Sequence, residues 1–156
     1  MLSWFIALSH SPLGQYMQNS RWGFAVVEAI HLLGLAVLGG AILVVDLRLL
    51  GFVLKGEHAR TVSRGLSKLL LSSLVVMILT GIALVSEEAL KCYHSPAFQW
   101  KMALLIAALL FYFTLHRAAL LRTEKYQADI WSRLAATVSI TLWFGVGVAG
   151  RAIGLL

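Results

Sequence analysis

Two ionisable residues, Glu28 and His31, interrupt the first long apolar segment of the chain. An ionisable side chain inside a membrane span is costly to insert, which makes it a functional candidate by default. The two residues are three apart and therefore share one face of a helix. Imidazole is a common axial ligand of haem iron. His31 is therefore our candidate ligand for b-type haem.

A second axial ligand would have to lie on a facing helix at the same depth. His31 is nine residues from Trp22 at the start of its span, whereas His116 is sixteen residues from Trp100. At 1.5 Å per helical residue this is a mismatch of roughly 10 Å, which disfavours a haem between His31 and His116. Met77, about ten residues from Glu87 beyond the second span, is level with His31. The spacing favours His31 with Met77, or His31 alone.

The remaining buried charges have simpler interpretations. Arg151 lies about as deep in the fourth apolar segment as Glu28 lies in the first, so we predict a Glu28–Arg151 ion pair. Such a pair would lock the helices together or serve a function, and the sequence does not separate the two roles. At the opposite end of the first segment Asp46 has three candidate partners, and we expect a structural pair there. They are Arg48, Arg117 and His116.

A short motif occurs twice, as HSPLGQY at 10–16 and HSPAFQW at 94–100. In each copy the serine suits a helix N-cap and the proline suits the first helical position, where its missing N–H costs nothing. A glutamine, Gln15 or Gln99, follows close to a capping-box position. The motif therefore predicts two helix starts, the first beginning a short interfacial helix that ends near residues 19–20.

The same region offers a different hypothesis, a copper site. Thiolate, thioether and imidazole groups are soft ligands suited to copper(I). Five such residues lie outside the long apolar segments or at their outer ends, but no His-x-x-x-His or Met-x-x-Met pair concentrates them. They are His10, Met17, Cys92, His94 and Met102.

The composition indicates that the chain is embedded in a lipid membrane. Of the 156 residues 60% are hydrophobic and 13% are charged, and the charged share is about half that of a soluble domain. Four apolar segments approach the roughly 20 residues that a helix needs to cross a bilayer. They run over residues 22–45, 69–86, 97–115 and 131–149. We predict one all-α membrane domain over 1–156, a four-helix up-down bundle with an outer interfacial segment at 1–20.

The basic residues predict the orientation of the bundle. Nine of the thirteen lie between the first and second spans or between the third and fourth, and four lie on the opposite side. By the positive-inside rule both chain ends face outside, which is the periplasm for a bacterial inner membrane. Their spacing would not follow a phosphate backbone, so we expect no nucleic-acid partner. The nine are Arg48, Lys55, Arg60, Arg64, Lys68, Arg117, Arg122, Lys125 and Arg133.

Small and polar residues predict how the spans pack. Glycines in the first and fourth spans permit close backbone approach, and an up-down order places these two spans side by side. They are Gly34, Gly39, Gly40, Gly145, Gly147 and Gly150. Three spans also carry polar residues at helical spacing, which we expect to face the interior. These stripes are Glu28, His31 and Asp46 in the first span, Ser73, Met77, Thr80 and Glu87 in the second, and Thr137, Thr141 and Arg151 in the fourth.

Three stretches carry a resemblance to known families. EAIHLLGLAVLGG at 28–40, DLRLLG at 46–51 and GVAGRAIG at 147–154 resemble small bacterial four-helix membrane proteins of unassigned function. More distantly, His31 and the Trp100-Lys101 pair are similar to HemJ-type protoporphyrinogen oxidases, which implies a bound haem with His31 and Lys101 at the matching positions. The HLLG…GG portion also resembles the membrane domain of CopD-type copper-resistance proteins, which implies copper passage.

These observations leave three functional hypotheses. The first is a small redox-associated protein that binds b-type haem through His31. The second is a non-catalytic subunit, in a homo-oligomer or a larger membrane complex, in which Glu28 and His31 are structural. The third is a copper-handling protein that uses His10, Cys92 and His94. The sequence contains no phosphate-binding loop, Ser-His-Asp triad or zinc-peptidase motif, which argues against a hydrolase.

Overall fold

The computed structural model describes residues 2–122 and 129–153, and this part of the chain is a bundle of helices without strands. Four helical segments are long and apolar enough to cross a membrane, which confirms the predicted all-α bundle. They are α3 (Arg21–Leu50), α4 (Ala59–Glu87), α6 (Pro96–Phe111) with its continuation, and α8 (Ile130–Ile153). The continuation of α6 is a π-helical turn η1 (Tyr112–His116) followed by α7 (Arg117–Arg122).

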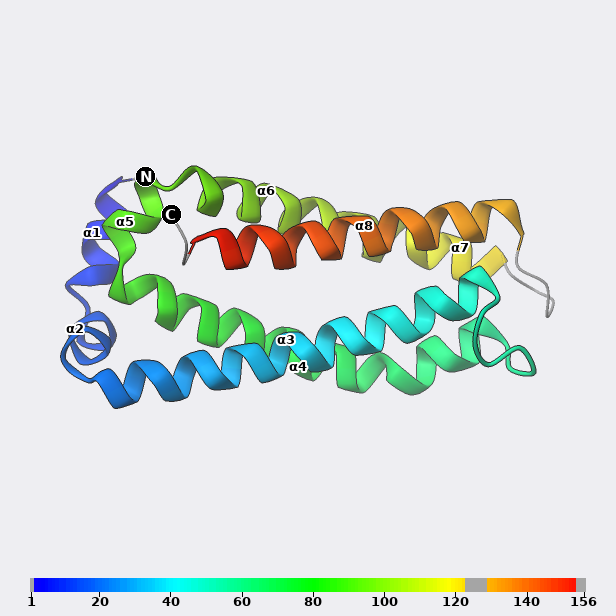
Figure 1. Cartoon of the computed structure of the whole chain (residues 1–156), viewed down its shortest axis with the longest axis horizontal. Coiled ribbons are helices and arrows are strands. Elements are labelled where there is room, and N and C mark those ends of the chain that lie inside the picture. Colours follow the sequence, from blue (N-terminus) through cyan, green and yellow to red (C-terminus); the bar gives the residue numbers. More distant parts are fainter. Residues whose placement is uncertain (1, 123–128, 154–156) are drawn as a thin grey trace.

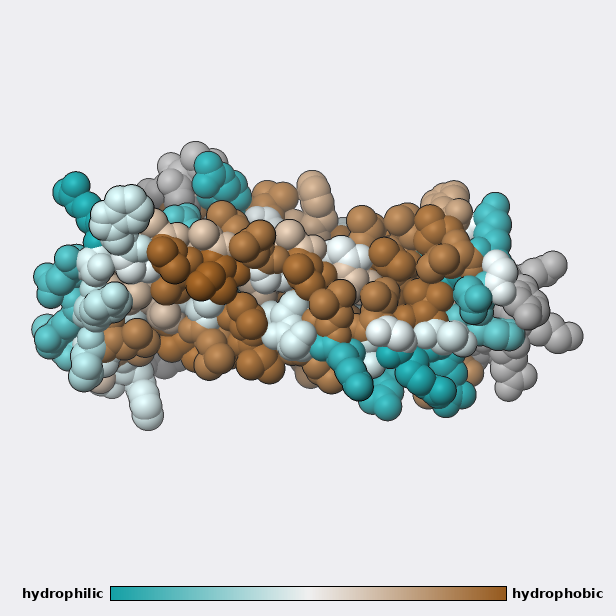
Figure 2. All heavy atoms as spheres, turned by 90° about the horizontal axis from the view of Figure 1, so that it is seen from below, coloured by the Kyte–Doolittle hydropathy of each residue, from teal (hydrophilic) through white to brown (hydrophobic). Residues whose placement is uncertain are grey.

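The spans form two antiparallel pairs, α3 with α4 and α6 with α8, joined mainly where α3 packs against α8 (Figure 1). Three short helices gather at the end where the chain begins: α1 (Leu2–Ser9), α2 (Pro12–Asn19) and α5 (Ala89–His94). We call this the cap end. The opposite end, which carries the α3–α4 connection, we call the loop end. Figure 2 shows an apolar belt between the two polar ends, as a bilayer requires.

Both copies of the Ser-Pro motif begin helices as predicted. Ser11 accepts a hydrogen bond from the Gly14 N–H at 3.1 Å and begins α2, and Ser95 accepts one from the Phe98 N–H at 3.4 Å and begins α6. The two glutamines reach back to backbone carbonyls, Gln15 to His10 at 3.1 Å and Gln99 to Tyr93 at 3.3 Å. The repeat is thus a helix-start device used twice.

All four spans are longer than predicted: α3, α4 and the α6 segment extend mainly at the loop end, and α8 extends mainly at the cap end. α3 continues five residues beyond 45, where Asp46 and Arg48 are buried, and ends at Gly51 in the left-handed conformation (φ 83°). α4 begins ten residues earlier than 69, because Ala59 packs into the core while the basic residues of this turn stay exposed. Lys125, one of the residues that predict the orientation, lies outside the described residues.

The hydrophobic core is concentrated toward the loop end. One cluster is built around Val45 and Leu49 of α3, and a second around Leu38 and Ile42, where Tyr112 and Trp143 complete it. Every buried residue of α3 lies at or beyond position 34. Toward the cap end α3 runs away from α8 (Figure 1). The half of the bundle that contains His31 is therefore the less tightly packed half.

The glycines pack differently from the prediction. The close glycine contacts lie within each helix pair. A Cβ on Gly34 would lie 3.4 Å from the Met77 sulfur of α4, and one on Gly145 would lie 3.4 Å from a Leu104 methyl of α6. Gly39, Gly40 and Gly147 have no neighbouring group within 4 Å of such a Cβ. α3 and α8 are neighbours, as expected, but these glycines do not mediate their contact.

Candidate functional site

His31 lies half-buried on α3 in the cap-end half of the bundle, facing α4. Its Nδ1 is 2.8 Å from the Thr80 hydroxyl, and that hydroxyl is 2.6 Å from the Val76 carbonyl oxygen. When the Thr80 hydroxyl donates to Val76, its oxygen accepts the Nδ1–H of His31. In that arrangement the imidazole proton is on Nδ1. The Nε2 lone pair remains, and no described residue bonds to it.

Gly81 of α4 and the side chain of Lys101 complete the surroundings of this imidazole. A Cβ on Gly81 would lie 3.5 Å from the His31 Cε1, so the glycine leaves the ring edge uncovered. Lys101 of α6 is close enough to His31 to act on it electrostatically. The lysine stem crosses Gly150 of α8, where a Cβ would lie 3.4 Å from its Cε and 3.5 Å from its Nζ. His31 of α3 thus contacts α4 directly, and Lys101 of α6, which packs on Gly150 of α8, lies within electrostatic range.

Met77, the second predicted haem ligand, lies on the helix that already packs against His31. Its sulfur rests on Gly34, one turn beyond His31, in the direct contact between α3 and α4. Two axial ligands must stand on opposite faces of a porphyrin, and this tight contact keeps the two helices together. The arrangement favours His31 as a single protein ligand over the His31–Met77 pair.

Glu28 and Arg151 are both exposed, and among the described residues no ion pair joins them. The predicted Glu28–Arg151 pair is therefore not formed. Equal depth is not sufficient, because α3 and α8, which carry the two residues, diverge toward the cap end (Figure 1). Glu28 lies instead on the side of Glu87 of α4, near enough for the two carboxylates to repel each other.

Asp46 and His116 form a pair in the loop-end half, as one of the three predicted alternatives. The His116 Nε2 lies 2.6 Å from the Asp46 Oδ1, and both side chains are fully buried. The imidazole stacks on the Tyr112 ring at 4.9 Å, within the π-helical turn. Ser139 lies close to the carboxylate, although its hydroxyl makes no hydrogen bond of ordinary geometry. Arg48 turns away and donates from Nε to the Glu57 carbonyl at 2.7 Å.

The polar stripe of the fourth span is rotated relative to the prediction. Thr137 and Thr141 are exposed and donate to carbonyls one turn earlier in α8, each at 2.9 Å. The buried polar residues of α8 are Ser132 and Ser139. Lipid tolerates the threonines because their hydroxyls are satisfied by their own helix.

The residues of the copper hypothesis are scattered over the cap end. His10 and His94 are exposed, with the His94 ring edge-on to Tyr93, whereas Met17 and Cys92 are buried. Over residues 2–122 and 129–153, no three His, Cys, Asp or Glu side chains are grouped to hold a metal ion. Burial, and then the nearby Glu88 carboxylate, raise the pKa of the Cys92 thiol. A protonated thiol is a poor metal ligand.

The chain belongs to a family of unknown function, DUF6644, which it matches over residues 11–156. No curated protein is significantly similar to it, and no solved structure is either. The family assignment agrees with the resemblance to small membrane proteins of unassigned function. The comparisons give no similarity to HemJ-type oxidases or to CopD-type proteins.

Two features of the sites lie beyond the sequence prediction. Thr80 stands in the predicted polar stripe of the second span, yet nothing in the sequence assigns it to His31, because that depends on how α3 and α4 are rotated. The π-helical turn at Tyr112–His116 has no signal in the sequence, although such turns are frequent at functional sites.

Proposed function

We propose that this protein is a small redox-associated membrane protein that binds b-type haem through His31. The observation that carries the proposal is the hydrogen bond from the His31 Nδ1 to Thr80, which leaves the Nε2 lone pair available. Ligating histidines commonly donate their second ring nitrogen to such a partner, which fixes the ring orientation and raises its basicity.

The surroundings of His31 fit such a group. Gly81 leaves the edge of the imidazole open, and the adjoining part of α3 has no fully buried residue to compete for the space. Lys101 would hold a propionate carboxylate by its charge, since the lysine makes no ion pair with any described residue. Haem b bound there would supply one-electron transfer. His31 would ligate it, Thr80 would orient His31, and Lys101 would position the macrocycle.

The visible spectrum of the full-length protein tests this function. Protein purified in detergent, from cells supplied with a haem precursor, is expected to have a Soret band that shifts on reduction with dithionite. His31→Ala is expected to abolish the band. Thr80→Val is expected to lower haem affinity by about 10- to 100-fold, as loss of a ligand's hydrogen-bonding partner does elsewhere.

The matched control is His94→Ala, which removes an exposed histidine outside the spans and should leave the Soret band unchanged. A Soret band that survives in His31→Ala would contradict the assignment of the ligand. A colourless protein that also fails to bind added haemin would contradict the function.

The second candidate is a non-catalytic subunit of a homo-oligomer or of a larger membrane complex. The exposed surface of α3 before residue 34 favours this candidate. Large side chains there, such as Trp22, Val26 and Leu33, are strongly exposed, and no residue of this segment is fully buried. Another subunit would cover this surface as well as lipid does. A colourless preparation that retains fixed partner proteins through purification would support this candidate over the first.

We also propose that the cap end faces the outside of the cell, the periplasm for an inner membrane, because the loop end carries the larger share of the basic residues. Alkaline phosphatase, which is active only outside the cytoplasm, is expected to be active when fused after Leu156 and inactive when inserted at Gly56. A fluorescent protein at the same two sites should give the reciprocal pattern. Activity at Gly56 alone would reverse the proposed orientation.

A further inference from the structure

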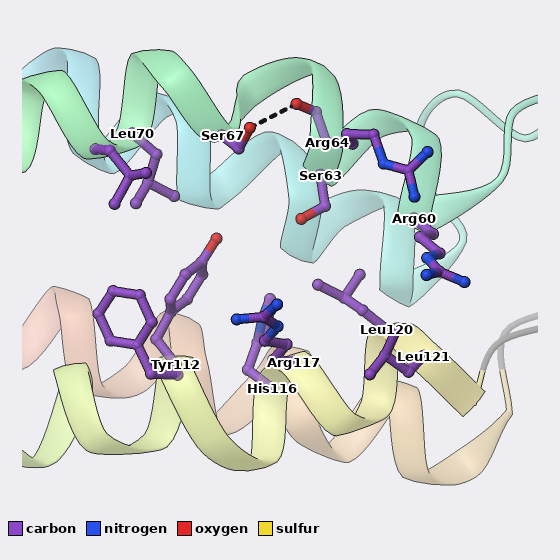
Figure 3. A pocket seen from close by; sticks show the side chains of 12 residues that line it. Arg60, Ser63, Arg64, Ser67, Leu70, Tyr112, His116, Arg117, Leu120 and Leu121 are labelled. Atoms are coloured by element: carbon purple, nitrogen blue, oxygen red, sulfur yellow. Dashed lines mark hydrogen bonds between the residues drawn. The ribbon is translucent and has the colours of Figure 1, made fainter.

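A cavity of about 360 Å³ lies between α4 and the η1–α7 segment, in the loop-end half of the bundle and away from His31 (Figure 3). The cationic part of its wall lies toward the loop end, where Arg60, Arg64 and Arg117 line it together with Leu120 and Leu121 (Figure 3). Leu70 and Leu71 of α4 line its deeper part. The cavity therefore passes from cationic to apolar along the direction in which a membrane passes from headgroup to acyl chain.

The deeper part of the cavity opens sideways toward the lipid. Leu71 and Phe113 line this part of the cavity and are each about half exposed. These side chains lie on the surface of the bundle, between the two helices that form the cavity. A chain lying along them would stay in contact with the bilayer, so a ligand could enter from the membrane without crossing the bundle.

The three arginines have no counter-charge in the described part of the protein. Neither aspartate nor glutamate lines the cavity, and none of the three makes an ion pair with a described residue. The buried acid nearest in the core, Asp46, is already bonded to His116. Three guanidinium groups that share one cavity without an acid repel one another unless an anion joins them.

Neutral polar groups lie beside the arginines. The Tyr112 hydroxyl points toward α4, on the side of Ser63 and Ser67 (Figure 3). The ring of His116 forms part of the wall, and its Nδ1 is buried without a hydrogen-bonding partner. The site thus offers hydroxyl and guanidinium donors for an oxygen-rich anion such as a phosphate, which arginine binds in a bidentate manner.

We propose that this cavity binds an anionic phospholipid, with the phosphate of its headgroup between Arg60, Arg64 and Arg117 and an acyl chain along Leu70, Leu71 and Phe113. The positive charge of the three arginines favours a negatively charged headgroup. The opening toward the lipid favours a ligand that is already in the membrane. Basic pockets between membrane helices bind anionic headgroups in this way. The proposal is independent of the haem hypothesis.

Native mass spectrometry of the delipidated, full-length protein in detergent tests the proposal. Dioleoyl phosphatidylglycerol is expected to bind with one tight site, at least about tenfold tighter than dioleoyl phosphatidylcholine, since each arginine near a headgroup contributes roughly fivefold. Replacing Arg60, Arg64 and Arg117 by Gln should abolish this preference. Arg117→Gln alone, the safer variant for folding, should lower phosphatidylglycerol affinity about fivefold.

The matched control replaces Lys55, Lys68 and Arg133 by Gln, which removes the same charge from the same end without touching the cavity wall. It should keep the preference for phosphatidylglycerol. If the control variant loses the preference as the cavity variant does, a diffuse basic surface is responsible and the proposed site is wrong. If inorganic phosphate binds as tightly as the lipid, and competes with it, the acyl-chain part of the proposal is wrong.

Discussion

Asp46→Ala is expected to lower the free energy of unfolding by about 3–5 kcal/mol, the usual cost of removing one partner from a buried pair. The His116 imidazole would keep a buried Nε2 without its acceptor, and its Nδ1 already has no partner. Because Tyr112 stacks on that imidazole, the π-helical turn would lose its anchor as well. Unfolding of the detergent-solubilised protein, followed by circular dichroism, measures the effect.

Two comparisons distinguish the effect of losing the Asp46–His116 hydrogen bond from the effect of losing side-chain volume. Ser139→Ala removes a neighbouring hydroxyl that makes no ordinary hydrogen bond, and it should change stability by less than about 1 kcal/mol. Replacing both Asp46 and His116 by Leu should cost less than Asp46→Ala alone, because no polar group is then left without a partner. Equal losses for Asp46→Ala and Ser139→Ala would show that the pair contributes little.

The helices of this protein could be predicted because local physics determines them. An apolar run of sufficient length has one stable form in lipid, and a Ser-Pro pair begins a helix wherever it occurs, as Ser11 and Ser95 do. The short helices α1 and α5 are different. Eight and six residues are too few for a helical period to be recognised, and both helices depend on packing against each other, as Phe5 does against Tyr93.

The partner of a polar side chain could be predicted only where equal depth in the membrane is enough to bring two side chains together. Asp46 and His116 lie at the same depth in the closely packed half, and they meet across the core. Glu28 and Arg151 also match in depth, but they lie where α3 and α8 diverge (Figure 1). In α8, the rotation of one helix decides whether Thr137 or Ser139 faces inward, although the two are only two residues apart.

The contrast between half-buried His31 and fully buried His116 explains why only one is a candidate ligand. His116 is fully enclosed and its Nε2 is bonded to an acid, in the half of the bundle where the core is continuous. His31 has its Nδ1 fixed and its Nε2 open, in the half where α3 buries little. Packing density thus assigns a structural role to one imidazole and leaves the other available for chemistry.

Gly14→Ala is expected to loosen the cap end and to expose the sole cysteine of the chain. A Cβ at this position would lie 2.6 Å from the carbonyl oxygens of Leu8 and Ser9, and backbone atoms cannot rotate away. Helix α1 must therefore shift, and α1 is the main neighbour of α5, where Cys92 is 7% exposed. The thiol pKa, raised by burial, would fall as water reaches it.

The rate of reaction of Cys92 with N-ethylmaleimide at pH 7.5 measures this shift, because the thiolate is the reactive form. The parent protein should react slowly, and its rate should keep rising above pH 9 because the thiol is still largely protonated there. Gly14→Ala should react faster, since a lower pKa raises the thiolate fraction, by about tenfold for each pKa unit. Phe5→Ala should act in the same direction by removing the contacts of α1 with Tyr93 and Phe98. Gly56→Ala, where a Cβ meets nothing within 4 Å, should react at the parent rate. If Gly14→Ala also keeps the parent rate, α1 is not what covers the cysteine.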